Sequence, residues 1–237
     1  MVNNSKIILL TEKIEGIRLR CIGDGNALIN AYRWDIKKDL RITSIKRLTR
    51  LMIGLNVSFI YLSNSDQKKI LESIRLVFEK DVEIMEYLLI NELFLKMGFV
   101  SSLFFIVESV LRDYLRFSDE ETYKKNKGIL EICNCLLGEK LEWNNIRFDC
   151  SVFDFLRLLR NTLHNNGVHI PQSKKEKIVT IEYKGKNYIF LEGERPNFVT
   201  WDLLLDLADD MRSLLFHIAN NKAIRSIPGL IFDTHSV

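Results

Sequence analysis

The chain has 237 residues, of which 47% are hydrophobic and 27% charged, and its formal net charge is +3. This composition is that of an ordinary soluble globular protein, long enough to bury a core without disulfide bonds. Three prolines and 11 glycines leave little room for a disordered linker. We therefore expect one continuous and mainly helical body.

The elements are expected in the following order. Residues 1–62 are expected to be mostly helical with a turn at 23–26, followed by a loop at 63–69. Helices are expected at 66–80 and at 83–97, the second either separate or a continuation of the first, and a central helix at 99–117. A shorter helix within 127–140, with Gly138 as its expected stop, precedes a helix at 150–167, a β-hairpin at 178–192 and an amphipathic helix within 200–221. The hairpin signal is alternation of branched and aromatic residues about "KGKN" at 184–187, which favours a loop longer than two residues. Thr200 is the expected N-cap of the last helix. The fold class is thus mainly α, a helical bundle with one small hairpin before the last helix.

Three regions are expected: an N-terminal helical region of unknown role at 1–95, a bundle at 96–222 and a tail at 223–237. No secretory signal is visible, and charges interrupt the apolar stretches before they reach the roughly 18 residues of a membrane span. We expect a cytoplasmic protein with no membrane partner. Its four cysteines are expected to be reduced thiols, because the Cys133/Cys135 spacing does not suit zinc.

Positive charge is concentrated near the N-terminus. Residues 1–60 hold 11 Lys and Arg against 5 Asp and Glu, a net charge of +6, so the other 177 residues carry −3. Seven of the basic residues fall within 33–50, and such a stripe could follow a phosphate backbone. The alternative is the solvated face of an amphipathic helix, because apolar residues recur beside them near helical period.

The stretch "LRLLRNTLHNNGVH" at 156–169 is the main candidate site. At about 100° per residue, Val152, Leu156, Leu159 and Leu163 form a core stripe, and Arg157, Arg160 and His164 form a second stripe at its edge. Neighbouring cations repel one another unless an anion lies among them. The structural alternative is also sound, since basic residues suit the last helical turn and Asn-Asn-Gly suits a C-terminal cap.

This pattern resembles the HEPN (higher eukaryotes and prokaryotes nucleotide-binding) superfamily. Its motif is Arg, four to six residues, then His, with a polar residue often directly after the Arg. Arg160 followed by Asn161 matches the polar part, with three residues before His164, whereas Arg157 has six residues before His164 but is followed by Leu158. The resemblance spans roughly 99–220. The stretch "RNTLHNNG" followed by a hairpin looks like bacterial HEPN-like proteins associated with abortive infection.

The resemblance implies a HEPN-like bundle and a metal-independent RNA endonuclease, acting as a toxin or phage-defence effector. It implies a homodimer, RNA as substrate, a possible antitoxin or other regulatory protein, and no cofactor or metal. The catalytic residues would be Arg160, His164, Arg157 and Asn161. The expected RNA-binding residues are Asn165, beside this motif, and Lys37, Lys38, Arg41 and Arg47 from the basic stripe at 33–50. Histidine suits acid–base work near neutral pH, and arginine offers forked donors to phosphate.

Two other functions remain open: a catalytically inactive HEPN module that binds RNA, a nucleotide or a protein partner, and a purely structural interaction domain. Of the remaining histidines, His169 is expected to be solvent-exposed in a loop. His217 is expected to be structural, and His235 to belong to the tail.

Overall fold

The computed structural model describes residues 4–64, 81–126, 128–142, 146–171 and 177–234. Its helices are α1 (Asn4–Tyr32), α2 (Leu40–Asn64), α4 (Asp81–Ser118), α5 (Glu120–Lys125), α6 (Ile129–Asn134), the π-helix η1 (Cys135–Lys140), α7 (Ile146–His164), α8 (Trp201–Asn220) and α9 (Lys222–Arg225). The strands are β1 (Ile178–Tyr183) and β2 (Lys186–Leu191). The mainly α class with one hairpin before the closing helices is confirmed, although two helices rather than one follow the hairpin.

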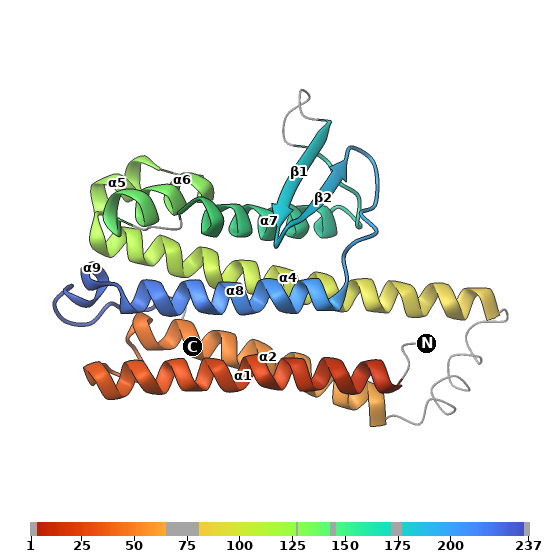
Figure 1. Cartoon of the computed structure of the whole chain (residues 1–237), viewed down its shortest axis with the longest axis horizontal. Coiled ribbons are helices and arrows are strands. Elements are labelled where there is room, and N and C mark those ends of the chain that lie inside the picture. The colour runs from red at the N-terminus through yellow and green to blue at the C-terminus, as the bar shows by residue number, and fades with distance from the viewer. Residues whose placement is uncertain (1–3, 65–80, 127, 143–145, 172–176, 235–237) are drawn as a thin grey trace.

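The long helices form layers around one core. Figure 1 shows α1 and α2 side by side, α8 and α4 next to them, and α7 on the far side with the hairpin above it. Buried apolar side chains from all these layers form a single cluster, which includes Ile14 of α1, Leu48 of α2, Leu111 of α4, Leu159 of α7 and Leu215 of α8. Most of the hydrophobic stabilisation therefore comes from packing between helices.

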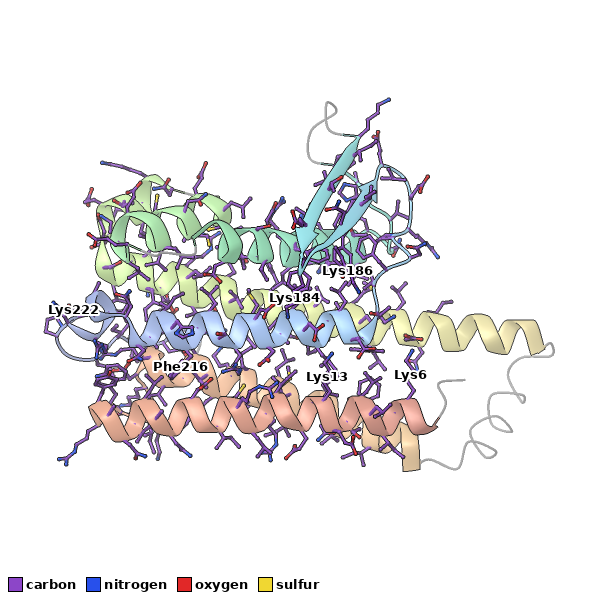
Figure 2. All side chains as sticks on the ribbon, viewed as in Figure 1. Lys6, Lys13, Lys184, Lys186, Phe216 and Lys222 are labelled. Atoms are coloured by element: carbon purple, nitrogen blue, oxygen red, sulfur yellow. The ribbon has the colours of Figure 1, made fainter. Side chains whose placement is uncertain are left out.

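The N-terminal helices share this core. Figure 2 shows Lys13 between α1 and α8, where its Nζ lies 2.8 Å from a carboxylate oxygen of Asp206. Arg20 pairs with Asp209 of α8 at 3.0 Å in the same way. The expected boundary at 95/96 falls inside α4, which runs without interruption from Asp81 to Ser118. The helices expected separately at 83–97 and 99–117 are therefore one helix, and the predicted helix at 66–80 lies outside the described residues.

The turn expected at 23–26 is wrong. α1 runs through "GDGN" as one helix from Asn4 to Tyr32, because Ile17, Cys21 and Leu28 keep the helical spacing on its buried face. A Cβ placed on Gly25 would lie 3.8 Å from Ile45 of α2, an ordinary contact. Tertiary packing therefore outweighs the weak helix propensity of the two glycines. Gly138 likewise lies inside η1 rather than at a helix end.

The hairpin has a shorter turn than expected. Tyr183 pairs with Lys186, so the loop contains only Lys184 and Gly185, with φ angles of 48° and 72°. Two positive φ angles are those of a type I′ turn, whose twist matches the strands. The expected loop longer than two residues is therefore wrong. The hairpin packs on α7 through Phe155, whose ring lies 4.9 Å from that of Tyr188.

The C-terminal segment is packed against the start of α2. Leu40 N donates to Ile231 O at 2.7 Å, and Asp233 N donates to Lys38 O at 3.3 Å. The side chains of Ile231 and Asp233 are buried. Residues 223–234 are therefore part of the fold and not a loose tail, and His235 lies outside the described residues.

Within the described residues, one stretch, Ile90–Ser118 of α4, is long and apolar enough to cross a membrane by length and composition alone. Its apolar window is 44% buried inside the protein. A central helix of a bundle has the same composition.

Candidate functional site at the end of α7

The sequence of α7 places its charged residues at the edge of the core. The predicted core stripe of Val152, Leu156, Leu159 and Leu163 is buried. The helix ends at His164, and Gly167 N donates to Thr162 O at 3.0 Å. Asn166 and Gly167 have φ angles of 56° and 82°, so the predicted left-handed cap is confirmed.

His164 is exposed and lies against α4. Its Nε2 forms a hydrogen bond of 3.2 Å with Ser101 Oγ. No carboxylate of the described residues forms an ion pair with the imidazole, and the residue is exposed to solvent rather than covered by apolar side chains. A ring held by one neutral hydroxyl and open to solvent is able to exchange a proton with a bound substrate.

Arg160 lies one turn before His164 and is half-buried. Its Nη1 donates to Asn161 Oδ1 at 3.0 Å, and its guanidinium lies 5.8 Å from the ring centre of Phe104 on α4. Among the described residues it has no carboxylate partner. The guanidinium therefore keeps most of its donors for another ligand, with Asn161 helping to orient it.

Arg157 differs from Arg160, although both belong to the predicted stripe. Its Nε donates to Asp154 Oδ1 at 2.7 Å, and the two residues form an ion pair one turn apart. Its side chain is only 17% exposed. Because its charge is neutralised internally, Arg157 is less suited than Arg160 to bind a phosphate.

The exposed position expected for His169 is wrong. Only 2% of the residue is exposed, because its backbone pairs with Gly193 and Glu194 beyond the hairpin and so lies under that loop. Nδ1 lies 3.4 Å from Thr162 Oγ1, and Nε2 is buried without a hydrogen-bond partner in the described part of the chain. Burial lowers the pKa of His169, the charge of Arg157 lowers it further, and Glu192 acts in the opposite direction.

The expected RNA-binding residues fall into different surroundings. Lys37 and Lys38 are exposed, and Asn165 is half-buried beside His164. Arg41 is 1% exposed and pairs with Asp39 at 2.6 Å, so the structure contradicts a surface contact between Arg41 and RNA. Arg47 is about nine-tenths buried in a basic hollow on α2.

The sequence pattern missed the partners that α4 and the loop before α8 bring to the site. Ser101 contacts His164, and a hollow of about 200 Å³ beside Leu163 and Gly167 is lined by Lys96 and Arg195. Lys96 is already engaged by Glu92 at 2.8 Å. Glu108 and Arg112 have the i, i+4 spacing at which opposite charges meet on one helix face, and they form an ion pair of 2.8 Å on the same half-buried face of α4 as Ser101.

The cysteines are free thiols, as expected. Cys133 of α6 and Cys150 of α7 nevertheless place their Sγ atoms 3.1 Å apart. Among the described residues, no group of three or more His, Cys, Asp or Glu side chains is arranged to hold a metal ion.

No family model, curated protein or solved structure gives a significant match to this chain.

Proposed function

We propose that the chain is a metal-independent RNA endonuclease of the HEPN kind, a cytoplasmic toxin or phage-defence effector. The observation that carries this proposal is the pairing on one helix edge of an exposed, hydroxyl-bound His164 with Arg160, a guanidinium without a carboxylate partner among the described residues. Arrangements of an acid–base group next to a fixed cation suit phosphoryl chemistry.

The reaction is attack of a ribose 2′-oxygen on the adjacent phosphorus. The O–P bond forms, the bond to the 5′-oxygen breaks, and the products are a 2′,3′-cyclic phosphate and a 5′-hydroxyl. His164 accepts the proton of the 2′-hydroxyl or delivers a proton to the leaving oxygen. Arg160 stabilises the charge on the phosphorane oxygens, and Asn161 and Ser101 position the guanidinium and the imidazole.

A homodimer fits this chemistry. Each motif contains a single histidine, His164, whereas the reaction needs one proton acceptor and one proton donor. Two motif helices that share a cleft would supply one histidine for each transfer. A regulatory partner such as an antitoxin would then act by covering or separating these helices.

The second candidate is a catalytically inactive HEPN module that binds RNA, a nucleotide or a protein. Two observations favour it: only three residues separate Arg160 from His164, and the better-spaced Arg157 is paired with Asp154.

The test is incubation of the protein with a labelled single-stranded RNA in EDTA. We expect cleavage with 2′,3′-cyclic phosphate ends, visible by mass spectrometry. His164→Ala and Arg160→Ala should lower the rate by at least about 100-fold, the usual contribution of one acid–base group or charge-stabilising donor. His217→Ala, which changes an exposed histidine on α8, is the matched control and should cleave at the wild-type rate.

Growth of a bacterial host gives a second readout. Expression of the wild type should arrest growth, and His164→Ala should relieve the arrest while keeping the circular dichroism spectrum and melting temperature. If the wild type and His164→Ala were equally toxic and cleaved RNA equally fast, the nuclease proposal would be refuted. RNA that is bound but stays intact would favour the inactive module.

A further inference from the structure

A second basic site lies on α2, separate from the end of α7. It is a hollow of about 470 Å³, a volume within the range of ligand pockets. The polar side chains that line it are four cations, one hydroxyl and one carboxylate: Lys37, Lys46, Arg47 and Arg50, with Thr43 and Asp233. We call this site the basic pocket.

The charges of the basic pocket are not balanced within the described residues. Its one carboxylate, Asp233, accepts a hydrogen bond from Thr43 Oγ1 at 2.7 Å and lies 3.6 Å from Arg47 Nη1. Lys46 Nζ donates at 2.6 Å to a neutral acceptor, the carbonyl of Ile36. In this part of the chain, no carboxylate forms an ion pair with Lys37, Lys46 or Arg50, so about three positive charges face the hollow.

Arg47 is the deepest of these cations. Its side chain is 10% exposed, and Nη2 donates to Ser109 Oγ of α4 at 2.8 Å. Nη1 is buried with no hydrogen-bond partner among the described residues. Burial lowers the pKa of Arg47, and Asp233 and Asp113 act in the opposite direction. A buried N–H without a partner is costly, and an anion in the pocket would satisfy it.

An exposed aromatic side chain lies beside this pocket. Phe105 of α4 is 52% exposed, and its ring centre lies 5.7 Å from the guanidinium of Arg47. Ser101, which holds His164, is one turn earlier on the same face of α4. Phe104, the residue next to Phe105, contacts Arg160. The exposed ridge of α4 therefore has the basic pocket on its α2 side and the motif residues on its α7 side.

We propose that the basic pocket binds a backbone phosphate of single-stranded RNA, that a neighbouring base stacks on Phe105, and that the strand continues over α4 to His164. Guanidinium and ammonium groups in a hollow suit a phosphate, and aromatic rings beside cationic grooves are typical of single-strand binding. This inference rests on the RNA-directed function proposed above.

The test is binding of a fluorescent 2′-O-methyl RNA dodecamer by anisotropy. This probe has no nucleophilic hydroxyl, so it reports binding without cleavage. Lys37→Ala/Arg50→Ala should weaken binding by about tenfold or more and reduce the salt dependence of log Kd by about 0.7, the value for one phosphate contact on a single strand. The matched control is Lys177→Ala/Lys186→Ala, which removes two exposed lysines of the hairpin region, one of them labelled in Figure 2, and should bind like the wild type.

Phe105→Ala should weaken binding about fivefold or more, the lower end of what one stacked base contributes. Phe94→Ala, which removes a 70% exposed ring elsewhere on α4, is its control and should have no effect. A duplex of the same sequence should bind independently of Phe105, because its bases are already stacked. Uridine monophosphate and inorganic phosphate should displace the probe only at concentrations far above that of an unlabelled dodecamer. If they displaced it at the same concentration as the dodecamer, the pocket would bind a single phosphate and the proposed track would be wrong.

The two proposals fail separately. If the pocket variants bind the probe like the wild type while the wild type cleaves ordinary RNA, the track over α4 is wrong and the nuclease stands. If the wild type binds the probe through the pocket but leaves ordinary RNA intact, the track stands and the nuclease is wrong.

Discussion

Arg41 provides a sharp test of the fold around the basic pocket. Its Nε and Nη2 donate to the two carboxylate oxygens of Asp39 at 2.8 and 2.6 Å, and Nη2 also donates to Gly229 O at 2.7 Å. The guanidinium lies 4.1 Å from the ring centre of Trp34. Arg41→Met keeps the length of the side chain but leaves the Asp39 carboxylate buried and unpaired.

The expected cost of Arg41→Met is large. Removing one partner of a buried ion pair costs roughly 3–5 kcal/mol. For a domain of this size each kcal/mol shifts Tm by roughly 2–4 °C, so Tm should fall by roughly 6–20 °C. Chemical denaturation and calorimetry measure both quantities. Lys38→Met, at an exposed position three residues away, should change stability by no more than about 0.5 kcal/mol.

The double variant Arg41→Met/Asp39→Asn should be more stable than Arg41→Met, because it removes the unpaired charge. A loss below about 1 kcal/mol for Arg41→Met, the value of an exposed pair, would refute the buried arrangement. Arg41 would then be a surface cation, and the prediction that it binds RNA would again be compatible with its position.

Two further predictions concern α7 and its contacts. Because burial holds the pKa of His169 below its ordinary value, the unfolded chain takes up a proton first, and the free energy of unfolding should decrease as pH falls below roughly 6.5. His169→Phe, which retains a ring beside Phe190, should flatten this dependence in denaturant titrations at pH 5–8, and an unchanged slope would contradict it. Mild oxidation with diamide should remove two thiols per chain by joining Cys133 to Cys150, whose sulfur atoms are 3.1 Å apart. Cys150→Ser should abolish that loss, and the same loss in the variant would show that other thiols had reacted.

Several elements could be predicted from local sequence, because local residues determine them. α8 begins where Thr200 caps it, with Oγ1 accepting from Leu203 N at 3.3 Å. α7 ends at Asn-Asn-Gly because left-handed backbone angles are accessible there. By contrast, the continuity of α1 through Gly23 and Gly25 depends on packing against other helices, which a single segment does not reveal.

The candidate site was predicted only in part, for a similar reason. Arg160 and His164 follow from helical spacing on one element. The burial of Arg41 does not, because the residues that cover it, including Gly229, lie more than 180 positions further along the chain. His169 is buried because the chain after β2 returns over it. Residues that share a stripe in sequence thus acquire different roles from partners distant in the chain.

Because α4 is continuous, it fixes the distance between the basic pocket and the end of α7. Ser101 beside His164 and Ser109 beside Arg47 are eight residues apart on one unbroken helix, an axial offset of about 12 Å. A continuous helix does not lengthen when a ligand binds. In the proposed track, a strand that reaches from the basic pocket to His164 has to span the separation that this helix sets, so the shortest oligonucleotide that occupies both sites depends on the protein backbone rather than on base sequence.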